Sequence, residues 1–353
     1  MKVLFCGLKY EYGKPGAGLS FEYQNFYEVL KAMDGVEAAG FFIDEQIARV
    51  GRDAMNAQLI KMVEDTKPDL LFCFLFTEEL KKETIGHITK KTSTKTFNWF
   101  ADDHWRLPVY SRFWAPLFTL VGTTDSKAPA RYAKYGIKNV IKTQWGVNTK
   151  LYHPAGQKEG GLDITFVGLN YSVREKYIKF LKNAGLPVTA FGSGWETGRI
   201  PKERTSIIWG SSKINLNFSE SYAYGPKFWL RSAARLFIKK ELGHYKSDVA
   251  NVYGNARSAL MMRHPQIKSR VFEIPACGGF LITGDADNLR DYFENGKEIV
   301  IFKDQKDLAE KCRYYLAHKQ ERENIARAGY ERTVKEHTYE QRFRKIFRDL
   351  GLM

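Results

Sequence analysis

A repeated alternation of strand-like and helix-like patterns is the feature that most constrains the fold of this chain. Residues 69–76 (DLLFCFLF) are apolar without a break, which is typical of a parallel strand covered on both faces. Helical patterns at 54–64 and 78–90 flank this stretch, and the alternation begins again after residue 163. This order predicts an α/β fold with two doubly wound parallel sheets. We expect strands at 2–7, 40–43, 69–76, 96–100, 117–123, 139–142, 163–168, 188–191, 214–218 and 280–283.

The segment 143–163 lies between the two alternating runs and indicates a domain boundary. It contains one proline and three glycines between residues 154 and 161, and it lacks apolar periodicity. A chain of 353 residues is also long for a single core. We therefore expect an N-terminal Rossmann-like domain over 1–152, a C-terminal one over 153–336, and a final helix over 337–353.

The composition excludes several protein classes. Hydrophobic residues make up 44% of the chain, so it is not a disordered protein. No apolar run reaches membrane-spanning length, and the opening MKVLFCG indicates a strand and not a signal peptide. The four cysteines have no CxxC spacing, which argues against a zinc site and for the reduced thiols of a cytoplasmic protein. The net charge of +15 points to polyanionic partners, such as nucleotide diphosphates, an anionic membrane or nucleic acid.

The stretch from 266 to 302 concentrates groups that suit a diphosphate. Lys268 and Arg270 precede a short helical run that carries Glu273, and Gly278 and Gly279 then lead into an apolar strand. Cations at a helix start attract anions, and a carboxylate one turn later can accept hydrogen bonds from ribose hydroxyls. Paired glycines let the backbone approach a ligand closely. The alternative is an ordinary helix–turn–strand unit with two solvated cations.

Other candidates follow the predicted strands of the second half. Gly168 comes directly after the strand at 163–168, and Arg174 follows one to two turns later. Gly192, Ser193 and Gly194 follow the strand at 188–191 and give that loop a permissive backbone. Ligands of doubly wound sheets bind beyond the carboxyl ends of the strands, and an arginine there can grip a phosphate with two donors. A solvated helix arginine is the alternative for Arg174.

An acidic cluster follows the predicted strand at 96–100. Asp102, Asp103 and His104 lie at this strand end, where a carboxylate or an imidazole can deprotonate an acceptor hydroxyl. Alternatively, the two aspartates only cap a helix or turn. No cluster of His, Asp or Glu in the sequence has the spacing of a metal site, so we expect no metal and no bound cofactor.

Three separated motifs carry a resemblance to a known family. KSRVFEIPACGGFLIT, DYFENGKEIVIF and LAHKQERENIARAGYERTVKEHTYEQR occur in this order and resemble the C-terminal half of CgeB-like (spore-maturation type) glycosyltransferases. Trp99, Asp102, Asp103 and Trp105 match an acidic W-x-x-D-D-x-W pattern of similar proteins. The resemblance implies a GT-B fold, with two Rossmann-like domains facing a cleft and a last helix that crosses back to the N-terminal domain.

The same resemblance implies a function and roles for residues. It implies transfer from a nucleotide-diphosphate sugar, such as a UDP- or GDP-sugar, without a metal ion. Glu273 would bind the ribose, Lys268, Arg270 and Arg174 the diphosphate, the loop at 192–194 the base, and Glu220 the donor sugar. The related retaining enzymes carry a Glu-x7-Glu motif, which makes retention more expected than inversion. However, Pro265 stands where the first glutamate of that motif would be.

The stretch 222–266 looks like a basic insertion. Ten Lys or Arg and two acidic residues lie between Tyr222 and Arg270. Residues 227–242 have the pattern of a basic amphipathic helix, which suits an anionic membrane surface and hence a cell-surface or lipid-linked glycan as acceptor. Such a protein would be cytoplasmic, with peripheral contact at the inner face of the membrane. Three alternatives stay open: a helix that packs on the core, a glycosyltransferase acting on nucleic acid, and an inactive GT-B scaffold.

Overall fold

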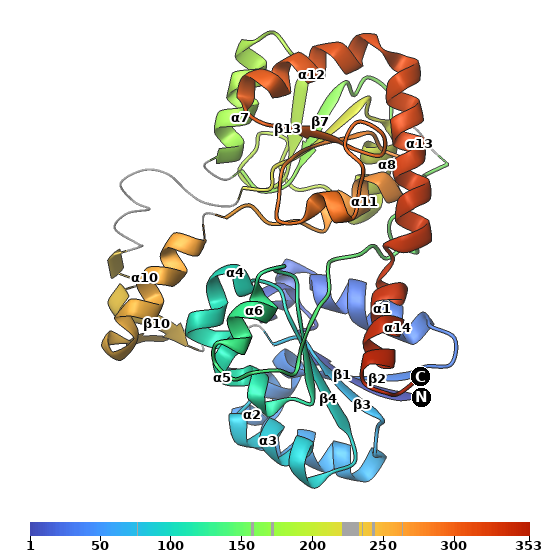
Figure 1. Cartoon of the computed structure of the whole chain (residues 1–353). Coiled ribbons are helices and arrows are strands. Elements are labelled where there is room, and N and C mark those ends of the chain that lie inside the picture. Colours follow the sequence, from blue (N-terminus) through green and yellow to red (C-terminus); the bar gives the residue numbers. More distant parts are fainter. Residues whose placement is uncertain are drawn as a thin grey trace. The chain divides into compact units, whose positions relative to one another are not determined.

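The chain forms two compact units, which we describe separately. The computed structural model describes residues 1–75, 77–156, 159–170, 173–220, 233–234, 236–241, 244–262 and 264–353. The N-terminal unit consists of Met1–Gln144, Arg231–Met261 and Tyr339–Met353, and the C-terminal unit consists of Trp145–Leu230 and Met262–Thr338 (Figure 1). Among the described segments, no helix has both the length and the apolar character needed to cross a bilayer.

A six-stranded parallel sheet forms the centre of the N-terminal unit. Its strand order is β2-β1-β3-β4-β5-β6, and β1 pairs with β2 on one side and with β3 on the other. Residues on both faces of β1 are buried, as expected for a parallel sheet covered by helices. The strands are β1 (Lys2–Gly7), β2 (Glu37–Phe42), β3 (Leu70–Cys73), β4 (Lys95–Phe100), β5 (Leu120–Thr123) and β6 (Val140–Lys142).

Helices between these strands complete the doubly wound arrangement. The predicted helix at 54–64 is part of α2 (Ile43–Thr66), which breaks at Gly51, where φ is +78°. A π-helical turn, η3 (Tyr23–Tyr27), runs into α1 (Glu28–Ala32), and a second one, η4 (Leu107–Ser111), follows α4. The other helices are α3 (Lys82–Lys91), α4 (Asp103–Arg106), α5 (Arg112–Trp114) and α6 (Ala128–Ala133), with short 3-10 turns η1 (Glu11–Gly13), η2 (Pro15–Ala17) and η5 (Ala115–Leu117).

The last helix of the chain, α14 (Tyr339–Asp349), packs within the N-terminal unit. Figure 1 shows α14 in red beside α1 in blue. The ring of Phe343 lies 5.4 Å from that of Phe26 and 5.3 Å from that of Phe72. These buried aromatic contacts fix the helix on the sheet, so the predicted return of the C-terminal helix to the N-terminal domain is confirmed.

The described part of the basic insertion also belongs to the N-terminal unit. β10 (Ile238–Glu241) pairs antiparallel with β11 (His244–Ser247), and a 3-10 turn, η6 (Val249–Asn251), leads into α10 (Val252–Met261). The Asn255 amide donates to the Leu236 carbonyl at 3.1 Å, and α10 packs against α4 and η4. The sequence placed this insertion in the C-terminal domain, and the contacts of α10 place it elsewhere.

The predicted amphipathic helix over 227–242 is wrong at its C-terminal end. Residues 238–241 form a strand, because the hydrogen-bonded ladder with β11 outweighs the local helical pattern. Residues 221–232, 235 and 242–243 lie outside the described part of the chain.

The C-terminal unit contains a five-stranded parallel sheet in the order β13-β12-β9-β7-β8. Along β13, Val300 and Phe302 face one buried cluster and Ile301 faces another, so both sides of the sheet are covered. The strands are β7 (Ile164–Val167), β8 (Val188–Phe191), β9 (Ile214–Asn217), β12 (Leu281–Gly284) and β13 (Val300–Phe302). The helices are α7 (Val173–Asn183), α8 (Lys202–Ser211), α11 (Arg270–Ala276), α12 (Gln305–Ala317) and α13 (Lys319–Glu336), with a 3-10 turn η7 (Leu289–Asp291).

The strand order creates a switch point between β7 and β9. From β7 the chain crosses to β8 on one side, and it later returns to β9 on the other side of β7. Doubly wound sheets bind their ligands at the carboxyl edge beside such a point, where the two crossovers diverge. The carboxyl edge of the C-terminal sheet is therefore the first place to look for a nucleotide site.

Candidate functional site

Most sequence-predicted donor residues lie at this carboxyl edge. Gly168 directly follows β7, the loop 192–194 directly follows β8, and Glu220 lies three residues after β9. Parallel strands end on the same side of a sheet, so these three segments share one edge. The structure thus brings together groups that are up to 52 positions apart in the sequence.

Arg270, the first residue of α11, is bound to the end of β7. Its Nη1 atom donates a hydrogen bond to the Val167 carbonyl at 2.6 Å. Within the described part of the chain, the guanidinium forms no ion pair with a carboxylate. Burial lowers the pKa of Arg270, and Glu273 opposes this effect. A half-buried cation whose only hydrogen-bond partner among the described residues is a carbonyl can bind an anionic ligand that neutralises it.

Three glycines make the close packing at this edge possible. A Cβ atom on Gly168 would lie 2.2 Å from Nη1 of Arg270, and one on Gly192 would lie 2.3 Å from the Gly168 carbonyl oxygen. Gly192 has φ +129° and Gly194 has φ +85°, both of which favour glycine. The loops after β7 and β8 therefore approach each other as bare backbone.

Arg174 and Arg270 flank the same aromatic ring. Their guanidinium carbons lie 5.6 Å and 5.7 Å from the centre of the Phe166 ring. Arg174 also donates to the Leu169 carbonyl at 3.3 Å and is 8% exposed. Two of the three cations that the resemblance assigns to a diphosphate are thus in contact with one side chain of β7.

Glu273 lies on α11, three residues after Arg270, and is only 3% exposed. Burial raises the pKa of its carboxyl to about 7, although a hydrogen bond with Ser269 and the charges of Arg270 and Lys202 act in the opposite direction. Lys268 lies two residues before Arg270 and is half-buried. The ribose role of Glu273 stays a prediction, since the carboxyl is covered by protein atoms.

Gly278 and Gly279 lie elsewhere, which corrects their grouping with the donor residues. They precede β12 and therefore lie at the amino edge of the sheet, opposite to Gly168. A Cβ atom on Gly279 would lie 2.6 Å from the Trp209 carbonyl oxygen of α8. Gly279 thus allows α8 to pack against the turn before β12, and Gly278 has a φ of +74° in that turn. The sequence alone could not separate such roles from ligand binding.

The acidic cluster of the N-terminal unit divides into buried and accessible groups. Asp103 is fully buried and accepts a hydrogen bond from the Tyr132 hydroxyl at 2.9 Å. Burial raises the pKa of Asp103 to about 6, although the neighbouring hydroxyls of Ser111, Thr123 and Tyr132 act in the opposite direction. His104 is 5% exposed, whereas Asp102 is half-buried. The burial of Asp103 favours a positioning role, which leaves Asp102 as the more accessible carboxylate.

A small cavity lies beside this cluster, within the N-terminal unit. Its volume is about 160 Å³, and Leu107, Pro108, Arg131, Lys134, Tyr135 and Arg257 line it. Arg131 donates to the carbonyls of Asp103 and His104 at 2.9 and 3.1 Å, so the cavity adjoins the acidic cluster. Arg257 comes from α10, which brings a cation of the basic insertion to this place.

Sequence reasoning missed several groups of the carboxyl edge. Trp195 donates from Nε1 to the Gly168 carbonyl at 2.8 Å, and Asn170 donates to the Gly194 carbonyl at 2.9 Å. The position of Trp195 directly after Gly192-Ser193-Gly194 was the available signal. No sequence pattern indicated that the Val167 carbonyl accepts a hydrogen bond from Arg270. Among the residues that the structure describes, no group of three His, Cys, Asp or Glu is arranged to hold a metal ion.

Comparisons with known proteins agree with this architecture. Residues 223–348 match the family model described as "Glycosyl transferase-like". The spore protein CgeB of Bacillus subtilis (strain 168) is 22% identical over 298 residues, which cover 82% of this chain and 85% of CgeB.

Solved structures show the same fold at low identity. The sucrose-phosphate synthase of Thermosynechococcus elongatus superimposes with a TM-score of 0.63 at 10% identity, covering 99% of both chains. HepE of Anabaena, solved in complex with UDP, has a TM-score of 0.57 at 11% identity, covering 100% of both chains. The chain therefore has the GT-B fold and is similar to CgeB, and its residues 223–348 match the glycosyl transferase-like family.

Proposed function

We propose that the protein is a glycosyltransferase that moves a sugar from a nucleotide-diphosphate sugar to an acceptor hydroxyl. The observation that carries the proposal is the Arg270 guanidinium at the end of β7, beside Gly168 and without a carboxylate partner in the described chain. A phosphate group bound there would complete the hydrogen bonds of this cation. The match to the glycosyl transferase-like family supports the same activity.

In the proposed reaction, the bond between the anomeric carbon and the diphosphate oxygen breaks, and a bond to the acceptor oxygen forms. Arg270, Lys268 and Arg174 neutralise the charge that develops on the leaving diphosphate. Glu273 contacts the ribose, the loop 192–194 the base and Glu220 the transferred sugar. HepE was solved with UDP and with UDP-glucose, which makes uridine nucleotides the first donors to test.

The acceptor is proposed to bind on the N-terminal unit. Asp102 takes the proton from the acceptor hydroxyl, and His104 and the buried Asp103 hold the segment in place. The cavity lined by Arg131, Lys134 and Arg257 supports an acceptor that carries a negative charge close to the reacting hydroxyl. Such a charge is common in cell-surface and lipid-linked glycans.

Contact with an anionic membrane surface is part of the proposal. The described part of the insertion, which is rich in Lys and Arg in sequence, exposes apolar side chains: Phe237 is 49% exposed, Val249 63%, Tyr253 80% and Leu260 65%. Apolar and basic groups together suit the interface of an anionic bilayer. Flotation with vesicles of anionic lipid, compared with vesicles of neutral lipid, tests this part separately from the chemistry.

The experiment for the activity is sugar release or transfer by the pure protein with UDP- and GDP-sugars. We expect turnover without added metal and in the presence of a chelator, with retention at the anomeric carbon. The Arg270→Ala variant should lose at least 90% of kcat/KM, which is about tenfold and corresponds to ~1.4 kcal/mol of transition-state stabilisation. Its melting temperature should stay close to that of the wild type. An unchanged kcat/KM in this variant would remove Arg270 from the site.

A further inference from the structure

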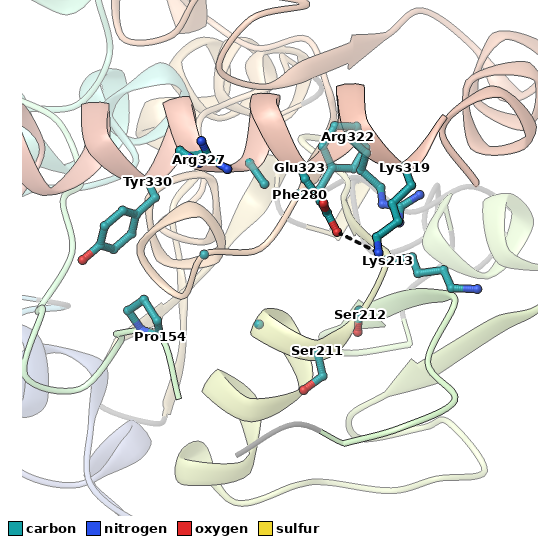
Figure 2. A pocket seen from close by; sticks show the side chains of 13 residues that line it. Pro154, Ser211, Ser212, Lys213, Phe280, Lys319, Arg322, Glu323, Arg327 and Tyr330 are labelled. Atoms are coloured by element: carbon teal, nitrogen blue, oxygen red, sulfur yellow. Dashed lines mark ion pairs between the residues drawn. The ribbon is translucent and has the colours of Figure 1, made fainter. Parts of the chain in front are cut away.

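The C-terminal unit contains a second cavity, at the edge of the sheet opposite to Arg270 and Gly168. Its volume is about 680 Å³, and it lies between α13 and the turns that precede β9 and β12. Figure 2 shows side chains of α13 on one side of the cavity and Pro154 and Ser211 on the other. The strands point away from this edge, so the cavity is distinct from the proposed donor site.

Cations dominate the wall of this cavity. Lys213, Lys319, Arg322 and Arg327 line it, together with the single carboxylate of Glu323. Lys319, Glu323 and Arg327 follow one another at intervals of four residues and so share one face of α13. Lys213 pairs with Asp163 at 2.5 Å, and Lys319 pairs with Glu323 at 3.8 Å. In the described part of the chain, this leaves two cations, Arg322 and Arg327, without a carboxylate partner.

Arg322 is the unusual member of this group, because it is a cation of which only 7% is exposed. Its guanidinium donates to the Tyr315 carbonyl, and burial lowers its pKa, although the charges of Glu323 and Asp163 act in the opposite direction. Neither carboxylate forms an ion pair with Arg322 in the described chain, so a bound anion would compensate the buried charge more fully. Arg327, five residues further along, is exposed and makes no hydrogen bond with the described residues.

The opposite wall supplies neutral groups and a close backbone. Gly210 approaches the Cys277 carbonyl so closely that a Cβ atom would lie 2.9 Å from that oxygen, and Gly278 has φ +74°. These two glycines leave backbone exposed between the side chains of Pro154, Ser211 and Ser212 on this wall. Tyr330 lines the same space. A volume of this size exceeds that of a single phosphate and suits a small organic ligand.

We propose that this cavity binds a ligand with several phosphate charges, either a short polyphosphate or a phosphorylated sugar. The planar guanidinium donates two parallel hydrogen bonds to a phosphate, which an ammonium group cannot reproduce. Arg322 and Arg327 hold the phosphate, Lys319 and Lys213 add long-range attraction, and Tyr330 contacts the remainder of the ligand. This inference does not rest on the proposed glycosyltransferase activity.

The test is calorimetric titration of the full-length protein with tripolyphosphate, glucose 6-phosphate and glucose. It uses the Arg270→Gln background, so that binding at the proposed donor site is removed. We expect tripolyphosphate or glucose 6-phosphate to bind and glucose not to bind, with an affinity that falls as salt rises. Arg327→Gln should weaken binding about tenfold. The probe that binds more tightly shows whether the natural ligand is a polyphosphate or a phosphorylated sugar.

The control is Lys335→Gln, which removes the same charge from an exposed position of α13 outside the cavity. It should leave binding unchanged. Arg322→Lys keeps the charge of the buried residue but loses the planar fork, so it should weaken binding while the protein stays folded. The proposal is overturned if neither phosphate probe binds, or if Lys335→Gln weakens binding as much as Arg327→Gln. If the Arg270→Gln variant loses nucleotide-sugar binding but still binds a phosphate probe, that result supports the proposed donor site and leaves the proposal for this cavity intact.

Discussion

The guanidinium of Arg270 occupies the space that a side chain at Gly168 would need. A Cβ atom at position 168 would lie 2.2 Å from Nη1 of Arg270, and that Nη1 atom donates to the carbonyl of the preceding residue, Val167. The smallest possible side chain at 168 would therefore displace the cation. This contact joins two segments 102 positions apart into one phosphate-binding candidate.

The first prediction concerns Gly168→Ala. The displaced Arg270 loses its hydrogen bond, so the affinity for a nucleotide-diphosphate sugar should fall tenfold or more, as expected for loss of a charged hydrogen bond (about 1.5–3 kcal/mol). Titration calorimetry with the active donor checks this. The matched control is Gly86→Ala in α3, where a Cβ atom meets nothing within 4 Å. That variant should bind normally and unfold at a slightly higher temperature. If both variants bind the donor with equal affinity, Gly168 does not contribute to the proposed donor site.

The second prediction is a pH dependence of stability that originates at Glu273. The pKa of this carboxyl is raised from 4.5 to about 7, so the native state holds the proton more tightly than the unfolded chain. The free energy of unfolding should therefore be highest near pH 4.5 and fall as the pH rises to 7. The total loss is about 3 kcal/mol, at ~1.4 kcal/mol per pH unit.

Glu273→Gln should remove this slope and be more stable than the wild type at pH 8. Urea unfolding of the two proteins across pH 5 to 8 measures the difference. Asp103 adds a similar slope between 3.8 and about 6 in both proteins, so only the difference between them reports on Glu273. The variant Glu310→Gln, at an exposed position of α12, should follow the wild type. Parallel curves for Glu273→Gln and wild type would contradict the assignment.

The third prediction separates Asp102 from Asp103. If Asp102 is the base, Asp102→Asn should lower kcat by a factor of about 100 or more without changing the melting temperature. Asp103→Asn disturbs the buried hydrogen bond with Tyr132, so it should lower stability by about 1–3 kcal/mol. Tyr132→Phe removes the same hydrogen bond from the other side and should also destabilise the fold. Full activity of Asp102→Asn at saturating donor would exclude this residue as the base.

The fourth prediction concerns α14. Phe343 is fully buried against Phe26, Phe72 and Trp99, so Phe343→Ala should destabilise the N-terminal unit by about 3–5 kcal/mol. Phe113 is 45% exposed, and Phe113→Ala should change stability by less than about 0.5 kcal/mol. Thermal unfolding of both variants provides the comparison. Similar melting temperatures would mean that the last helix contributes little to the N-terminal core.

The fifth prediction concerns the insertion. Arg257 reaches the cavity beside the acidic cluster from α10. If the acceptor carries a negative charge there, Arg257→Gln should raise the KM for the acceptor several-fold and leave the KM for the donor unchanged. If only the KM for the donor changes, Arg257 does not bind the acceptor and the prediction is wrong.

Local patterns were sufficient for most of the fold. The strand expected at 2–7 is β1, the strand expected at 188–191 is β8, and the stretch at 69–76 contains β3. Most residues of these segments are apolar and buried, so a short apolar run was a sufficient signal for a strand. The final helix was recognisable because its apolar residues form a single stripe.

The errors have a common physical cause, which is contact between distant segments. Residues 238–241 have a helical pattern but form a strand, because they pair with residues 244–247. The helix α10 packs against α4, which is far from α10 in the sequence. Gly278 and Gly279 resemble ligand-binding glycines, yet the neighbouring Trp209 carbonyl explains the absence of a side chain at 279. A sequence pattern records which residues are small or charged, but not which backbone atoms surround them.

The N-terminal unit is assembled from three separated stretches of chain, and the last of them begins at Tyr339. A ribosome synthesises this stretch after the other two stretches of the unit and after the whole C-terminal unit. Phe26, Phe72 and Trp99 must therefore wait for Phe343 while some 240 intervening residues are translated. During this interval these three side chains lack one of their packing partners, so the N-terminal unit can be completed only after the C-terminal unit has been synthesised.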